Sequence, residues 1–182
     1  VCQDLHRWNE QGIRRSVSVN VSRCDIREDR DIPGQFSRLI QKYGITPDQL
    51  HIEITETAFA ENPDLLISNT NKLRELGFQV EMDDFGSGYS SLHMLKEVPV
   101  DRIKLDLHFL TSSGDQKKSR TIVGCMIQMV ELLEMKMIAE GVETVEQAEF
   151  RRNRGWPEMQ GYYFFKRKPV EECGRGKEES GK

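Results

Sequence analysis

Short runs of apolar and β-branched residues recur along the chain, and segments with helical periodicity lie between most of them. The runs predict strands over residues 16–22, 50–56, 78–84, 101–106, 136–143 and 161–165. Apolar stripes at helical spacing predict helices over residues 31–43, 63–76, 119–134 and 144–155. Successive strands are roughly 25–35 residues apart, the size of one βα unit. The pattern therefore predicts an α/β fold with a mainly parallel sheet.

Composition sets limits on this fold and on its partners. The 182 residues suit one domain, and 37% hydrophobic with 31% charged residues is typical of a globular chain. A net charge of −4 gives no support for binding a nucleic acid polymer through a basic surface. No apolar run is long enough to span a membrane, and no signal peptide is visible. The chain does not begin with Met, so we expect it to be part of a longer protein.

The cysteines indicate the cellular compartment. The four cysteines, at positions 2, 24, 125 and 173, form no CxxC pair and have no neighbouring histidine partner. This spacing favours reduced thiols and a cytoplasmic location over a disulfide framework or a zinc site.

Polar residues gather at the carboxyl ends of the expected strands. They are Asn20, Glu53, Glu56, Asp83, Asp84, Lys104, Asp106, Glu140, Glu143 and Gln160, the last just before the final expected strand. Active sites of parallel α/β folds lie at the carboxyl ends of strands, and in a (β/α)8 barrel these ends converge on one mouth. We therefore expect these side chains to share a site.

Several carboxylates at one mouth would repel one another without a cation, and oxygen ligands suit Mg²⁺ or Mn²⁺. Two such ions can hold a phosphodiester and activate a water molecule. Asp83 and Asp84 are adjacent and would face opposite sides of a regular strand, but a turn at Gly86 could bring both to one site. The alternative for any single acid is a helix cap or a solvated loop, and Lys104 could be a structural ion-pair partner facing inward.

Six stretches, in this order and spacing, resemble the EAL-domain cyclic di-GMP phosphodiesterases. They are "NVS" (20–22), "EITET" (53–57), "DDFGSGYSSL" (83–92), "PVDRIKLD" (99–106), "AEGVET" (139–144) and "QGYYF" (160–164). The resemblance extends from about residue 3 to about residue 170. It implies a TIM-like (β/α) barrel that hydrolyses cyclic di-GMP to linear pGpG with two Mg²⁺ or Mn²⁺ ions.

The resemblance also implies a role for each matching residue. Asn20 and Glu53 would ligate one metal ion, Asp83 would bridge both ions, and Asp84 would serve the second. Lys104 would hold the attacking water, and Glu140 would be the general base or the carboxylate next to it. The remaining implied roles are substrate binding by Gln160 and Asp106, and anchoring of the loop after the aspartates by Glu56, Gly86 and Glu143.

Departures from the family lead to further expectations. The Glu-Ala-Leu stretch that names the family, with its metal-ligating Glu, would precede residue 1, so we expect an N-terminally truncated barrel with about six of the eight strands. Residues 1–170 would form this partial EAL domain, and residues 171–182 a disordered tail. Pro157 replaces an expected Asp, and residues 165–169 read "FKRKP" where the family has "SKP". We expect the 182 residues alone to hydrolyse cyclic di-GMP poorly or not at all.

Two other functions stay open. A catalytically inactive EAL domain could act as a cyclic di-GMP receptor or a protein-docking module, and a related barrel hydrolase could cut a different phosphodiester. By the resemblance, the whole domain would form a homodimer, and sensor or GGDEF domains would accompany it in the longer protein.

Overall fold

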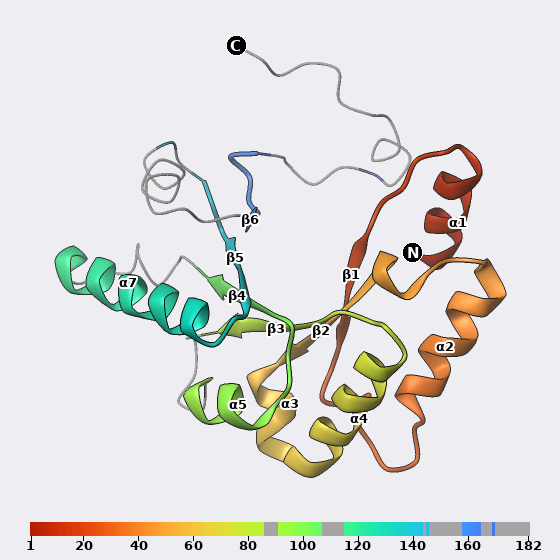
Figure 1. Cartoon of the computed structure of the whole chain (residues 1–182), viewed down its shortest axis with the longest axis horizontal. Helices are drawn as coiled ribbons and strands as arrows, with labels where there is room; N and C mark the ends of the chain where they lie inside the picture. Colours follow the sequence, from red (N-terminus) through yellow and green to blue (C-terminus); the bar gives the residue numbers. More distant parts are fainter. Residues whose placement is uncertain (86–90, 107–114, 144, 146–157, 165–168, 170–182) are drawn as a thin grey trace.

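A computed structural model describes residues 1–85, 91–106, 115–143, 145, 158–164 and 169 of the chain. Its centre is one sheet of six parallel strands, which lie side by side in chain order (Figure 1). The strands are β1 (Val17–Val21), β2 (Leu50–Thr55), β3 (Val80–Phe85), β4 (Arg102–Asp106), β5 (Lys136–Glu140) and β6 (Glu158–Met159). Because the strands are parallel, all their carboxyl ends lie at the same end of the sheet.

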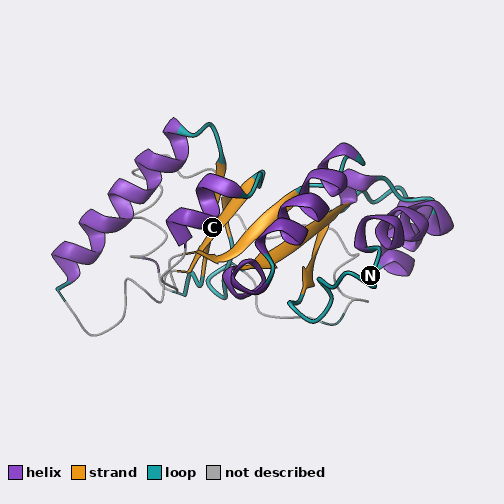
Figure 2. Cartoon of the chain, turned by 90° about the horizontal axis from the view of Figure 1, so that it is seen from below, coloured by secondary structure: helices purple, strands orange, loops and turns teal. Residues whose placement is uncertain are grey.

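Helices connect and cover these strands. They are α1 (Cys2–Glu10), α2 (Ile32–Tyr43), the 3₁₀ turn η1 (Pro47–Gln49), α3 (Glu56–Glu61), α4 (Pro63–Glu75), α5 (Ser91–Glu97) and α7 (Gln116–Leu132). Helices α3, α4, α5 and α7 lie on one side of the sheet, and the strands curve away from them (Figures 1 and 2). The helices thus cover the convex face.

The alternation of side chains along each strand explains this arrangement. On β2, β3 and β4 every second residue is apolar and fully buried, including Ile52, Val80 and Ile103. Because neighbouring side chains in a strand point to opposite faces, these residues pack under the helices and the residues between them face the concave side. Those between them are mostly polar, so the core lies between sheet and helices and the concave face is charged.

The helix boundaries follow from local capping. The side chain of Asp31 accepts a hydrogen bond from the backbone amide of Gly34 at 3.0 Å and caps α2, which ends at Gly44 in the left-handed conformation with a φ of 59°. Asn62 caps α4 in the same way through the amide of Leu65, at 3.2 Å. The predicted helices over 31–43, 63–76 and 119–134 therefore agree with α2, α4 and α7 to within three residues at each end.

The last predicted strand is wrong. The sequence "GYYFF" predicts a strand over residues 161–165, but the structure places β6 at Glu158–Met159 and turns at residues 162–164. A Cβ atom on Gly161 would lie 2.3 Å from the carbonyl oxygen of Val142, so the chain approaches another backbone segment too closely for a side chain. The amide of Tyr163 then donates to the same carbonyl at 2.9 Å. Tertiary contact overrides the β propensity of the aromatic residues.

Some expectations lie outside the described residues. The helix expected over 144–155, apart from residue 145, and the tail over 171–182 belong to this group. Within the described part of the chain, β1 and β6 form the two edges of the sheet. No helix among the described residues is both long enough and apolar enough to cross a membrane.

The buried convex face gives a first prediction. Ile52 is 0% exposed on β2, whereas Leu132 at the end of α7 is 85% exposed. We expect Ile52→Ala to lower the free energy of unfolding by about 2–5 kcal/mol, because it removes buried methyl groups and leaves a cavity. The control Leu132→Ala should change it by less than about 0.5 kcal/mol. Urea unfolding measures both, and equal effects would contradict the assignment of this face as the core.

Candidate metal and catalytic site

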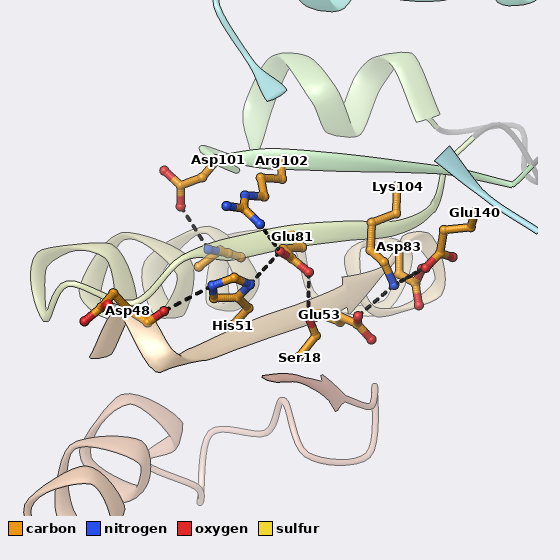
Figure 3. Close-up of polar contacts among 11 residues, drawn as sticks. Ser18, Asp48, His51, Glu53, Glu81, Asp83, Asp101, Arg102, Lys104 and Glu140 are labelled. Carbon is orange, nitrogen blue, oxygen red and sulfur yellow. Dashed lines mark hydrogen bonds and ion pairs between the residues drawn. The ribbon is translucent and has the colours of Figure 1, made fainter. Parts of the chain in front are cut away.

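The ammonium group of Lys104 lies among three carboxylates near the carboxyl ends of the strands. Its Nζ atom is 2.7 Å from Oε1 of Glu53, 3.2 Å from Oδ1 of Asp83 and 2.6 Å from Oε1 of Glu140. Figure 3 shows the three carboxylates turned toward this nitrogen. Lys104 itself is 4% exposed. A buried cation thus joins the acids that the sequence predicted to share a site.

Strand register brings these residues together. Lys104 lies on β4, Asp83 on the neighbouring β3 and Glu140 on the other neighbour, β5, while Glu53 lies on β2, with β3 between it and Lys104. In a flat sheet β2 and β4 would be about 9.6 Å apart, twice the strand spacing. The 2.7 Å contact between Lys104 and Glu53 therefore reaches over β3 on the concave side of the sheet, a span that two long side chains can bridge.

The adjacent aspartates occupy an irregular point in β3. The pairing between β3 and β4 shifts between Met82 and Phe85, and Asp84 has a φ of 56°. Aspartate enters this left-handed region more readily than most residues, and such a bulge turns the side chains of a strand. The amide of Asp84 donates to Oδ1 of Asp83 at 3.0 Å. The sequence predicted that a turn at Gly86 would bring both aspartates to one site. Gly86 lies outside the described residues, and the irregular backbone that the structure does describe is at Asp84.

The three carboxylates keep Lys104 charged. Burial alone would lower its pKa, but the hydrogen bonds and negative charges of Glu140, Glu53 and Asp83 outweigh burial and raise the pKa well above its ordinary value. Lys104 is therefore a permanent ammonium ion at neutral pH.

Two acids near Lys104, Glu140 and Asp84, have raised pKa values. Burial, with the nearby charges of Asp83 and Glu53, raises the pKa of Glu140, because one ammonium shared among three carboxylates does not offset them. The pKa of Asp84 is also raised, first by burial and then by the charges of Asp83 and Asp106. A carboxylate with a raised pKa at a strand end is the kind of group that accepts protons in catalysis.

The remaining predicted site residues surround this cluster. Asn20 pairs with Glu53 in the β1–β2 ladder, and Asp106 pairs with Glu140 in the β4–β5 ladder, so each lies beside a member of the cluster. Gln160 follows β6 directly, and its backbone amide donates a hydrogen bond to the backbone carbonyl of Ala139 at 2.8 Å. It is thus at the carboxyl end of a strand rather than before one, next to the strand end that carries Glu140.

The loop-anchoring residues are less well placed. Glu56 begins α3 immediately after β2, but its side chain is outside what the structure describes, as is the whole of Gly86. Glu143 is exposed, three residues beyond the end of β5. Their predicted roles stay predictions.

The donor chemistry of the site fits a hard divalent cation. Glu53, Asp83, Asp84 and Asn20 offer carboxylate and amide oxygens, the ligands that Mg²⁺ and Mn²⁺ prefer. In the part of the chain that the structure describes, no three acidic, histidine or cysteine side chains are already arranged as a ligand group. Lys104 is instead the counterion of Glu53 and Asp83, and it contacts one oxygen of each, Oε1 and Oδ1. The second oxygen of each carboxylate is a further donor for a metal ion.

Sequence reasoning missed a second polar group on the concave face. Glu81, 1% exposed, accepts a hydrogen bond from Oγ of Ser18 at 3.0 Å, and its Oε1 lies 3.0 Å from Nδ1 of His51 and 3.3 Å from Nη1 of Arg102. We call these four residues the lower layer, because they lie nearer the amino ends of the strands than the site does: Ser18, His51, Glu81 and Arg102 (Figure 3). Burial would raise the pKa of Glu81, but the hydrogen bonds from His51 and Ser18 and the charges of His51 and Arg102 lower it below its ordinary value.

The sequence held a partial signal for the lower layer. Glu81 lies two residues before Asp83 in an otherwise apolar strand, so both must face the concave side. Its partners are 21 to 63 residues away in sequence, and local patterns do not reveal such pairs.

The parallel strands and the acid–lysine site at their carboxyl ends define a barrel-type α/β domain. Comparison with known proteins identifies the family: residues 1–167 match the family described as EAL domain. The chain belongs to the EAL domain family, whose fold is a TIM-like barrel, and its six strands form part of such a barrel.

Individual relatives agree with this family. The cyclic di-GMP phosphodiesterase PdeR of Escherichia coli is 34% identical over 170 residues, which are 93% of this chain and 26% of PdeR. The EAL domain of Mycobacterium smegmatis DcpA has a TM-score of 0.86 at 28% identity and covers 95% of this chain and 78% of that one. A manganese and cyclic di-GMP complex of Klebsiella pneumoniae BlrP1 has a TM-score of 0.78 at 27% identity, with 88% and 41% covered. The chain thus spans about a quarter of the length of PdeR.

Removing the central cation gives the second prediction. Lys104→Met should lower the free energy of unfolding at pH 7 by about 3–5 kcal/mol, because buried Glu53 and half-buried Asp83 and Glu140 lose their counterion. The raised pKa of Lys104 means that its stabilisation is fully present at pH 7. Burial and the charges of Asp83 and Glu53 raise the pKa of Glu140, so this group takes up a proton as the pH falls. Wild type then loses the ion pair between Lys104 and Glu140, the variant loses part of its repulsion, and the difference should shrink.

The control for this variant is Lys96→Met. Lys96 is 79% exposed on α5 and pairs with Glu97 on the surface, so its loss should change stability by less than about 0.5 kcal/mol. Chemical unfolding at pH 7 and pH 4.5 measures both variants. A difference between wild type and Lys104→Met that is equal at the two pH values would rule out the carboxylates as its cause.

Proposed function

We propose that the chain is the catalytic part of a cyclic di-GMP phosphodiesterase that hydrolyses cyclic di-GMP to linear pGpG. The observation that carries this proposal is the buried ammonium of Lys104 in contact with Glu53, Asp83 and Glu140. This cluster is built from the family's motifs, and relatives such as PdeR bear the name of this activity. The reaction breaks the bond between phosphorus and the 3′ oxygen, and the elements of water are added across it.

Two Mg²⁺ or Mn²⁺ ions are part of the proposal. Asn20 and Glu53 would hold one, Asp84 the other, and Asp83 both. When bound, such ions neutralise phosphate charge and make a water molecule more acidic. The oxygen donors of these residues support this choice, as does the manganese in the BlrP1 complex.

The other residues act on the water and on the developing charge. The fixed ammonium of Lys104 can donate a hydrogen bond to the attacking water and stabilise negative charge as the new oxygen–phosphorus bond forms. Glu140 would accept a proton from that water, and its raised pKa supports this role. Gln160 and Asp106, at the ends of β6 and β4, would contact the substrate, and Glu56, Gly86 and Glu143 would order the loop between β3 and α5.

The setting of the domain is also proposed. We infer a cytoplasmic domain that forms a homodimer and is linked to sensor or GGDEF domains in a longer protein. The name of one relative, the oxygen sensor protein DosP of Escherichia coli, supports the sensor domain.

A cyclic di-GMP receptor without catalysis is the second candidate. The ion pairs that Lys104 makes with Glu53 and Asp83 favour it, because each takes one oxygen of a carboxylate that the metal ions would also use. The two functions share the binding site and differ only in turnover, so one assay separates them.

The third prediction concerns turnover. With Mg²⁺ or Mn²⁺, the longest form of the protein that its gene encodes should convert cyclic di-GMP to pGpG, and a chelator should abolish the reaction. Asp83→Asn should reduce kcat at least about a hundredfold, since it removes a charge from the reacting centre. Chromatography of the nucleotides measures the rate, and the 182-residue chain is assayed beside it.

A matched control is Asp64→Asn, which changes an acid in the first turn of α4 away from the strand ends and should leave kcat within about twofold, as for surface positions in general. Tight binding of cyclic di-GMP without hydrolysis would replace the phosphodiesterase with a receptor. Hydrolysis that survives in Asp83→Asn would contradict the role of this residue.

A further inference from the structure

We propose that Glu81 is a positioning residue for the candidate site: it holds strands β1 to β4 at the register and curvature that bring the site residues together. The proposal rests on the proposed function for its catalytic meaning. The lower layer lies next to the site on the same strands, toward their amino ends (Figure 3).

Each member of the lower layer lies two residues before a site residue on the same strand. Ser18 precedes Asn20, His51 precedes Glu53, Glu81 precedes Asp83 and Arg102 precedes Lys104; these are the four pairs. Residues two apart in a strand share a face and are about 6.6 Å apart along it. The position of each site residue along its strand axis is therefore fixed once the lower-layer residue on the same strand is fixed.

The contacts of Glu81 extend beyond the neighbouring strands. Arg102 and His51 come from β4 and β2, which flank β3, but Ser18 comes from β1, with β2 between. Strands β1 and β3 would be about 9.6 Å apart in a flat sheet. The 3.0 Å hydrogen bond from Ser18 to Glu81 therefore needs the concave curvature, because the serine side chain is short. The same four strands carry the site residues, so the hydrogen bond holds the curvature on which their relative positions depend.

The charge of Glu81 is stable only when the strands are correctly arranged. Glu81 is almost fully buried, and a buried charge is costly unless its partners are in place. Its partners come from three other strands, so Glu81 is fully paired only when all four strands are in register and curved. His51 adds a fifth element, because its Nε2 atom lies 3.2 Å from the carbonyl oxygen of Asp48 in η1.

A slip of one strand would separate the site residues. One residue of register moves a strand by about 3.3 Å and turns its side chains to the other face. The contact of 2.7 Å between Lys104 and Glu53 does not survive such a shift, because one of the two side chains would then face the helices. Glu81 thus acts through the backbone of four strands on Asn20, Glu53, Asp83 and Lys104, and touches none of the reacting atoms.

The test uses Glu81→Gln, which keeps the size of the side chain and removes its charge. We expect Mn²⁺ affinity and kcat to fall by about 10- to 100-fold, the range for residues that support metal ligands indirectly, while KM for cyclic di-GMP changes little. Glu81→Asp, which restores the charge, should recover part of both. Calorimetry with Mn²⁺ and steady-state kinetics give the two readouts on the full chain.

The control separates positioning from stability. Ile52 lies on β2 facing the helices, away from both layers. Ile52→Val or Ile52→Ala, whichever matches the melting temperature of Glu81→Gln, should keep wild-type Mn²⁺ affinity and kcat. Should Glu81→Gln behave like this matched control, the proposal is overturned. Ser18→Ala, a milder change, should move affinity and kcat in the same direction if Glu81→Gln does not fold.

Crystal structures make the result independent of the proposed function. If the longest form of the protein that its gene encodes binds no Mn²⁺ and hydrolyses nothing, the proposed function fails, and the variant structures alone decide the positioning role. A Lys104–Glu53 distance in Glu81→Gln or Ser18→Ala beyond hydrogen-bonding range supports the proposal. The wild-type distance of 2.7 Å retained in either variant overturns it.

Discussion

The ion pairs of Lys104 are the interaction on which the rest of the structure depends. One buried ammonium contacts acids from β2, β3 and β5, and its own strand, β4, lies between two of them. Buried charges persist only where partners are close and well oriented. The cluster therefore constrains four strands at once, and it concentrates charge at the carboxyl ends of the strands, where a phosphodiester and metal ions can be bound.

The two faces of the sheet divide the work between stability and chemistry. The convex face is apolar and packs under helices, which provides the burial that holds the fold together. The concave face carries the lower layer and the site above it, both made of charged residues paired across strands. Because strand side chains alternate with a period of two, one stretch such as "VEMDD" supplies core residues and site residues in turn.

Sequence patterns predicted the strands and helices that local signals specify. Five of the six strands and three helices agree with prediction, because alternation of side chains and the caps Asp31, Gly44 and Asn62 act within a few residues. Lys104 is the inward ion-pair partner that the sequence allowed as an alternative, and its catalytic role stays a proposal. The errors came from contacts between distant segments: Gly161 against Val142 replaced a strand with turns, and the partners of Glu81 were invisible in local sequence.

A crystal structure of the chain grown with Mn²⁺ and collected for anomalous scattering tests the central claim most directly. We expect two anomalous peaks at the carboxyl ends of β1 to β3, within ligand distance of Glu53 and Asp83, with Asn20 and Asp84 completing the oxygen donors. The ion pairs of Lys104 can remain, because each carboxylate has a second oxygen for the metal. A map without a peak at this site, at saturating Mn²⁺, would contradict a metal-dependent phosphodiesterase.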